Sequence, residues 1–179
     1  MFHLVTDGAC GPRNPGFMAV GVVIFNPKGE LFYQYHGKLV WGTNSTAEYE
    51  ALIRGLEAAR DLKLTRIRAS VDSQLLYHQL SGSYQVRAKH LKSLHRQVKS
   101  LMQGFSYVEL TWHSRETPEA RIADAVSKGQ SFKLGDVLCP PVVEAIVIKA
   151  PAPPTKLVPK KSAPVRRFSS FQDLKQMTP

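Results

Sequence analysis

Four acidic residues stand in sequence contexts that would present a carboxylate to a shared site. Asp7 and Asp72 each follow an apolar run that predicts a strand, whereas Glu48 and Asp124 lie in stretches where apolar residues recur at helical spacing. Carboxylate oxygens are hard ligands that suit Mg²⁺ or Mn²⁺. Four of them, drawn from strand ends and helix faces, can surround two such ions, which is the usual arrangement for in-line attack on a phosphodiester.

The overall charge indicates which kind of substrate such a site would meet. The chain has 179 residues, with 24 Lys and Arg against 14 Asp and Glu, and a formal net charge of +10. A strongly basic balance of this kind favours a polyanionic partner. Together with the four acids, the charge predicts a nuclease.

The absence of targeting signals and the spacing of the cysteines indicate the cellular compartment. No apolar run approaches the roughly 20 residues of a membrane helix, and the N-terminus lacks the charged and long apolar regions of a secretory signal. Cys10 and Cys139 lack metal-type spacing, so we interpret them as free thiols, with a disulfide as the less favoured alternative. We therefore expect a cytoplasmic protein without membrane contact.

Composition divides the chain near Gly135. Residues 1–135 hold 17 Lys and Arg and 11 Asp and Glu, a net +6, while residues 136–179 hold 7 and 3, a net +4. Most of the prolines fall in the second part, where they block helices and sheet ladders alike. We predict a catalytic domain over 1–135 and a basic, Pro-rich, mostly disordered tail over 136–179. The tail could add salt-sensitive contacts to nucleic acid or dock a protein partner.

Apolar patterning and turn signals predict the elements that position the four acids. The expected order is β-β-β-α-β-α-α-β-α, in which the second and third strands form a hairpin. This order is typical of an α/β fold with a five-stranded mixed sheet and helices on its faces. We expect strands over 2–6, 17–25, 30–35, 65–71 and 105–112, and helices over 43–61, 74–80, 86–102 and 118–128.

Five short strings occur in a characteristic order along these elements. They are Asp-Gly-Ala from Asp7, Asn-Pro-Gly from Asn14, Asn-x-x-x-Glu-Tyr-x-Ala-Leu from Asn44, Val-Asp-Ser-Gln around Asp72, and Ala-Asp at Asp124. Over roughly its first 130 residues the chain resembles type 1 ribonuclease H on these strings. The resemblance implies a ribonuclease H-like fold in a compact form, without the basic protrusion of some members. The tail has no counterpart in that family's catalytic domain.

The resemblance implies an endonuclease that cuts the RNA strand of RNA–DNA hybrids and leaves 5′-phosphate and 3′-hydroxyl ends. It further implies that Asp7 and Asp124 hold the ion that activates the attacking water. Asp7, Glu48 and Asp72 would hold the ion near the leaving 3′ oxygen. Glu48, and not the neighbouring Glu50, is the acid of the matching string. We expect a monomer whose partner is the hybrid.

Substrate contacts are also implied by the resemblance. Asn14, Gly16, Asn44 and Gln74 stand at positions that contact the hybrid in this family. Glycine near Asn14 would let backbone groups approach ribose hydroxyls, and the 2′-hydroxyl is what distinguishes RNA from DNA. The local alternative is that these Asn and Gln side chains cap turns and helix starts.

The loop before Asp124 departs from the family pattern. Ala120 replaces the usual Asn, and Arg115 stands in the loop where many relatives carry a mobile His, with His113 closer to the strand end. Arg115 is a catalytic candidate because it could stabilise charge on the scissile phosphate or the leaving group. The alternative, equally open, is a surface pair with an acid such as Glu116.

Structural roles compete with the catalytic ones. Asp7 could cap a turn, Asp72 could cap the helix that begins nearby, and Glu48 could complement a helix dipole or close a capping box. Asp124 could be a surface residue. The rival functions are a hybrid-binding module with little or no chemistry, and a DNA nuclease of the same fold, such as an integrase or resolvase core.

Overall fold

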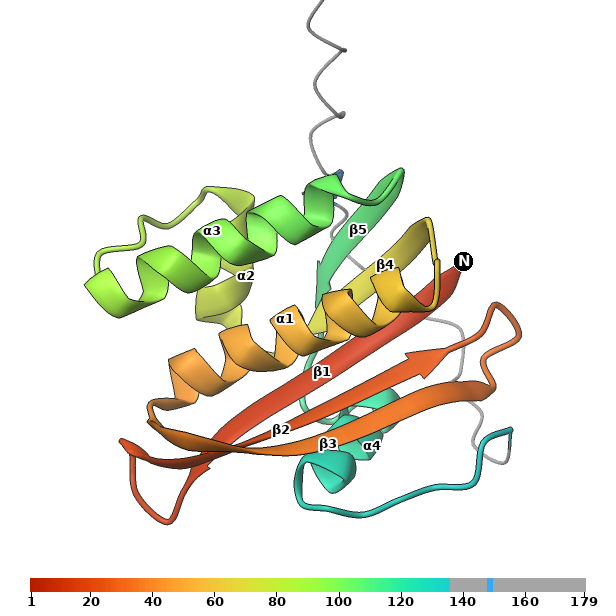
Figure 1. The fold of residues 1–179 in the computed structure, drawn as a ribbon, viewed down its shortest axis with the longest axis horizontal. Helices are drawn as coiled ribbons and strands as arrows, with labels where there is room; N and C mark the ends of the chain where they lie inside the picture. Colours follow the sequence, from red (N-terminus) through yellow and green to blue (C-terminus); the bar gives the residue numbers. More distant parts are fainter. Residues whose placement is uncertain (136–147, 150–179) are drawn as a thin grey trace, which may run out of the picture.

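The structure, a computed structural model, describes residues 1–135 and 148–149. Figure 1 shows a sheet with helices on both of its faces. Within the described residues the helices are α1 (Asn44–Asp61), α2 (Gln74–Ser81), α3 (Lys89–Gln103) and α4 (Pro118–Ser127). The strands are β1 (Phe2–Gly11), β2 (Gly16–Phe25), β3 (Leu31–Gly42), β4 (Arg66–Val71), β5 (Tyr107–Trp112) and β6 (Ile148–Lys149).

The sheet has the strand order β3-β2-β1-β4-β5-β6, which places β1 near its centre. β2 pairs with β1 and β3 in antiparallel fashion, whereas β4 runs parallel to both β1 and β5. The short β6 is antiparallel to β5 at the far edge. Parallel strands need crossover connections, and here α2 and α3 provide the crossover from β4 to β5.

Two apolar clusters on opposite faces of the sheet form the core. Neighbouring residues of a strand point to opposite faces, so Leu4 and Val5 of β1 join different clusters. Leu4 shares its cluster with Leu56 of α1 and Val98 of α3, and Val5 shares the other with Val126 of α4. Helices α1 and α3 therefore cover one face, and α4 covers the other (Figure 1).

Hydroxyl side chains cap three of the helices at the ends that face the acids. Thr43 accepts a hydrogen bond from the N–H of Thr46 at the start of α1, and Thr117 caps α4 in the same way. The N-cap of α2 is Ser73, whose hydroxyl accepts from Leu76 N at 3.3 Å. Asp72 is therefore not the cap of α2, and its carboxylate is free for another role.

The predicted order of elements is confirmed, and several boundaries differ from the prediction. β1 continues to Gly11 because residues 7–11 pair with β2, so Asp7 lies within a strand rather than after its end. β3 likewise pairs with β2 as far as Gly42, and α3 begins at Lys89. β6 is an additional strand within the predicted tail; residues 136–147 and 150–179 lie outside the described part of the chain. No helix of the described residues is long and apolar enough to cross a membrane.

Candidate active site: a carboxylate cluster at the central strand

The register of the parallel strands sets two of the predicted acids side by side. Thr6 pairs with Val71, so Asp7, the next residue of β1, lies beside Asp72, the first residue after β4. On the other side of β4, the N–H of His113 donates to the carbonyl oxygen of Val71 at 3.1 Å. The neighbouring strands β1, β4 and β5 therefore bring three polar side chains, Asp7, Asp72 and His113, to the lining of one pocket.

A glycine beside Asp7 lets α1 bring in the third acid. A Cβ atom at Gly8 would lie 2.3 Å from the carbonyl carbon and oxygen of Ala47 and 2.5 Å from the nitrogen of Glu48. No other residue leaves that space, so the first turns of α1 rest directly on β1. Glu48 is consequently 3% exposed and lies next to Asp7.

A second glycine lets α4 approach from the opposite face of the sheet. Gly21 of β2 is the register partner of Asp7, and a Cβ atom there would lie 2.3 Å from the carbonyl oxygen of Ala123 and 2.5 Å from the nitrogen of Ser127. This close packing carries the next residue of α4, Asp124, to the rim of the pocket that Asp7 lines.

Three of the four predicted acids form a compact cluster. One carboxylate oxygen from each of Asp7, Glu48 and Asp72 lies within 4.8 Å of the others. The Oδ2 atom of Asp7, the Oε2 atom of Glu48 and the Oδ1 atom of Asp72 are all buried without a hydrogen-bond partner. Buried anionic oxygens without partners are costly, so the cluster is built for a cation.

Burial raises the pKa of two of these acids. The pKa of Asp7 is raised mainly by burial, and neighbouring carboxylates add to the rise while a hydrogen bond with Ser127 opposes it. The pKa of Glu48 is raised well above its ordinary value, first by burial and then by the charges of Asp72 and Asp7. Both shifts have the direction expected for buried acids among other acids, and the charge of Arg115 opposes them only in part.

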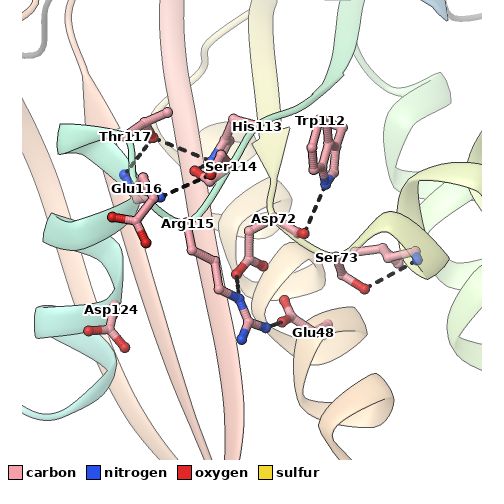
Figure 2. A network of polar contacts seen from close by, with 12 residues as sticks. Glu48, Asp72, Ser73, Trp112, His113, Ser114, Arg115, Glu116, Thr117 and Asp124 are labelled. Atoms are coloured by element: carbon pink, nitrogen blue, oxygen red, sulfur yellow. Dashed lines mark hydrogen bonds and ion pairs between the residues drawn. The ribbon is translucent and has the colours of Figure 1, made fainter.

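Arg115 supplies part of that positive charge. Its Nε atom lies 2.6 Å from Oδ2 of Asp72, and its Nη2 atom lies 4.0 Å from Oε1 of Glu48. Figure 2 shows the side chain reaching from its loop between these two acids. The hydrogen bond to Asp72 is the main reason why the pKa of Arg115 is raised. Arg115 pairs with the candidate site and not with Glu116, which bonds Arg121 instead.

Asp124 has a different environment from the other three. Its side chain is 49% exposed and its Oδ2 atom lies 2.7 Å from Nζ of Lys128, one turn further along α4. In Figure 2 it stands on α4, across the pocket from Glu48. Asp124 lines the same pocket but does not belong to the compact cluster.

Two of the four predicted substrate-binding residues, Asn14 and Asn44, meet at the neighbouring rim. The side-chain oxygen of Asn14 accepts from the backbone N–H of Asn44 at 3.2 Å, and that of Asn44 accepts from the N–H of Cys10 at 2.8 Å. Asn44 and Cys10 also line the pocket. Gly16 lies just beyond, at the start of β2, whereas Gln74 is exposed at the first turn of α2 and does not line the pocket.

Three further residues support the acids and were not predicted. The indole Nε1 of Trp112 donates to the backbone oxygen of Asp72 at 3.0 Å, which fixes the chain where it leaves β4. The hydroxyl of Ser127 donates to the backbone oxygen of Asp124 at 2.8 Å, and Ser127 lies close enough to Asp7 to oppose the rise in the pKa of that carboxyl. Lys128, four residues after Asp124, has ordinary ion-pair spacing.

The donor set fits a hard divalent cation. The three orphaned oxygens come from carboxylates, the ligands that Mg²⁺ and Mn²⁺ prefer. The guanidinium of Arg115 lies at the other oxygen of two of these carboxylates, Oδ2 of Asp72 and Oε1 of Glu48, and leaves the three orphaned oxygens without a partner. Asp7, Glu48 and Asp72 are thus the residues that would hold an ion, with Asp124 within the same pocket.

Comparisons with known proteins agree with this fold. The family profile described as reverse transcriptase-like matches residues 5–129. Ribonuclease HI of Halobacterium salinarum is 35% identical over 125 residues, 70% of this chain and 61% of that protein. The crystal structure of RNase H1 from that archaeon has a TM-score of 0.66 at 34% identity, over 69% of this chain and 92% of the other. LC11-RNase H1, solved in complex with an RNA/DNA hybrid, has a TM-score of 0.63 at 31% identity, over 69% and 91%.

The sheet order and the converging carboxylates define a ribonuclease H-like domain, as the sequence predicted. The chain belongs to the reverse transcriptase-like family, and type 1 ribonucleases H are among its relatives. It spans 61% of the length of the curated Halobacterium relative, which is less than two thirds.

Proposed function

We propose that this protein is a ribonuclease H that hydrolyses the RNA strand of RNA–DNA hybrids. The observation that carries the proposal is the cluster of Asp7, Glu48 and Asp72, whose oxygens converge within 4.8 Å from three separate elements. The cluster lies at a pocket of about 330 Å³ that is open to a large ligand. Relatives of the same fold are ribonucleases H, and one of them was solved with an RNA/DNA hybrid.

The chain's own residues would divide the work in the following way. Asp7, Glu48 and Asp72 would hold one divalent ion, and Asp7 with Asp124 a second. Such ions, Mg²⁺ or Mn²⁺, supply an activated water and stabilise the charge on the leaving oxygen. Arg115 is 76% exposed beyond its contact with Asp72, so its remaining donors can bind a phosphate oxygen.

Selection of RNA would fall to the other rim of the pocket. Asn14 and Asn44 hold each other through one amide oxygen and a backbone N–H, which leaves their side-chain NH₂ groups free to donate. Amide donors beside the cluster can read the ribose 2′-hydroxyl, the group that DNA lacks. The formal net charge of +10 adds affinity that depends on salt but not on sequence.

The proposal is tested with one set of labelled substrates in Mg²⁺: an RNA–DNA hybrid, duplex DNA, duplex RNA and the single strands. We expect cutting within the RNA strand of the hybrid, with 5′-phosphate and 3′-hydroxyl ends, and no cutting in EDTA. Cleavage of duplex DNA would favour the DNA-nuclease alternative. Tight binding of the hybrid with no cleavage in either Mg²⁺ or Mn²⁺ would favour a binding module.

A further inference from the structure

An exposed aromatic pair lies at the end of the sheet next to the pocket. The three most exposed large apolar side chains in the described part of the chain are Val40 (80%), Trp41 (58%) and Phe17 (67%). The rings of Phe17 and Trp41 meet edge to face, with centroids 5.4 Å apart and an interplanar angle of 81°. An edge-to-face pair leaves most ring faces open, and contiguous exposed apolar side chains of this kind are typical of an interaction site.

The register of β2 and β3 places the two rings side by side on the surface. Phe17 and Trp41 are register partners at the ends of β2 and β3, and the ladder is irregular between Phe17 and Met18. Met18 pairs with Leu39, so Val40 is the extra residue of a β-bulge. Bulges re-aim side chains and are common beside functional sites. β3 is an edge strand, so no further strand of the described residues covers it.

The pair continues directly from the substrate rim of the pocket. Phe17 follows Asn14 by three residues and Trp41 precedes Asn44 by three, a reach of about 10 Å along an extended chain. Asn14 and Asn44 are hydrogen-bonded to each other, and Asn44 lines the pocket. Figure 1 shows the β1–β2 turn and the β3–α1 connection at the same end of the sheet.

The charge around the pair favours a polyanion. From residue 8 to residue 47 the only acid is Glu30, which lies in the β2–β3 turn at the opposite end of the hairpin. The same stretch carries Arg13 in the loop beside Phe17 and Lys38 on β3, and both are exposed. Aromatic rings among cations without acids are the usual composition of a single-strand nucleic-acid surface.

We propose that Phe17 and Trp41 form a stacking platform for unpaired nucleobases of a strand that runs on from the hybrid bound at the pocket. This inference rests on the proposed function and extends its substrate to hybrids with a single-stranded extension. Bases paired within the hybrid are stacked on each other, whereas an unpaired base offers a free face to the two rings. The protein would then bind a hybrid with an overhang more tightly than a blunt one.

The test compares binding of blunt hybrids with binding of hybrids that carry a short 5′ or 3′ extension on either the RNA or the DNA strand. Fluorescence anisotropy in EDTA measures affinity without cleavage. We expect the wild-type protein to prefer one extended hybrid over the blunt one by about fivefold or more, the lower end of one base stacked on an aromatic ring. Which extension is preferred identifies the strand.

Matched variants separate stacking from charge and from general packing. Trp41→Leu and Phe17→Leu keep an apolar side chain but remove the ring, and should abolish the preference without changing affinity for the blunt hybrid. Trp41→Phe should retain it. Phe32→Leu removes an exposed aromatic elsewhere on β3 and should have no effect. Equal melting temperatures check that the variants fold.

Three results would overturn the platform: no preference in the wild type, an unchanged preference in Trp41→Leu and Phe17→Leu, or a wild-type dimer that Trp41→Leu converts to a monomer in sedimentation. The last result would assign the patch to pairing of β3 edges. Cleavage of the blunt hybrid in Mg²⁺ is measured in parallel. Its absence would contradict the proposed function, while the EDTA binding data would still decide the platform.

Discussion

The acids on the two sides of the pocket are held in opposite ways. Glu48 and Asp72 lie with Asp7 in a buried cluster that has orphaned oxygens and raised pKa values for Asp7 and Glu48. Asp124 is half exposed on α4 and has its own cation in Lys128. The first group holds three acids with one nearby cation, Arg115, and keeps orphaned oxygens, whereas Asp124 is paired one to one with a lysine.

The two environments suggest different roles in binding a cation and in cleavage. The buried cluster is fixed by the β1–β4 register and by the contact of α1 with Gly8. Asp124 depends on one helix and a flexible lysine pair, which contributes little to stability when exposed. We therefore expect the cluster to dominate cation binding and Asp124 to act mainly on the rate of cleavage.

The largest effect is expected from Asp7→Asn, because Asp7 faces both groups of acids. Cleavage of the hybrid should fall by far more than about a hundredfold, the upper range for residues that only support a metal ligand. Binding of the hybrid should be retained, since the variant removes a negative charge facing a polyanion. Turnover and affinity measured on the same hybrid check both parts. Substantial turnover in Asp7→Asn would break the assignment of the cluster.

Asp124→Asn should reduce cleavage strongly while leaving cation binding by the cluster largely intact. The rise in melting temperature on adding Mn²⁺ reports that binding, since a ligand specific to the folded state stabilises it. We expect wild type and Asp124→Asn to show similar rises and Glu48→Gln a much smaller one. Loss of the rise in Asp124→Asn would place this residue in the cluster.

Substitutions at Gly8 and Gly21 separate the packing of α1, which carries Glu48, from the packing of α4, which carries Asp124. Gly8→Ala should push α1 away from β1, and Gly21→Ala should push α4 away from β2, each at a cost of about 1–3 kcal/mol in unfolding free energy. Only Gly8→Ala should also abolish the Mn²⁺-induced rise in melting temperature, because it displaces Glu48. Chemical denaturation and thermal shift measure the two effects. Equal loss of the Mn²⁺-induced rise in both variants would show that the position of α4 matters as much for cation binding as the position of α1.

Stability in EDTA should depend on the pH through the buried acids. The folded-state pKa of Glu48 is raised, so the folded protein holds this proton to a higher pH than the unfolded chain does. The stabilisation is complete below the ordinary pKa of about 4 and is lost as the pH rises through the raised value. Glu48→Gln should therefore gain melting temperature relative to wild type as the pH increases. A constant difference from pH 4 to pH 8 would argue against the raised pKa.

The smallest effects concern the chain beyond the domain. Residues 151–179 hold six Lys and Arg and one Asp, a net of +5. The strand β6 precedes this segment, so the two can be removed separately. Ending the chain at residue 150 should weaken hybrid binding at low salt and flatten its salt dependence, with turnover unchanged. Ending it at residue 135 should in addition lower the melting temperature slightly, because the edge of β5 loses β6. Equal melting temperatures would show that β6 adds no stability.

Much of the site could be predicted because its residues lie in short local strings. Asp7, Glu48 and Asp72 were identified from such strings, and the structure brings them together. The order of strands and helices was readable from apolar periodicity. The local capping alternative for Asp72 was resolved only by the structure, since Ser73 performs that role.

Features that depend on residues far apart in the chain could not be predicted from the sequence. Residues 7–11 are small or polar and form a strand only because β2 pairs with them. The close approach at Gly21 requires α4, a hundred residues later in the chain. Phe17 opens the apolar run predicted as a strand over 17–25, and the sequence did not show that its side chain is 67% exposed, at the start of β2 beside a bulge.

If the buried cluster binds the cations that support cleavage of RNA in a hybrid, Glu48 sets the Mn²⁺ dependence of that cleavage. Single-turnover cleavage of one hybrid across a Mn²⁺ titration tests this with wild type, Glu48→Gln and the neighbouring Glu50→Gln. We expect Glu50→Gln to follow the wild-type curve, while Glu48→Gln needs far more Mn²⁺ and remains slower at saturation. Wild-type rate and Mn²⁺ dependence in Glu48→Gln would contradict this role of Glu48.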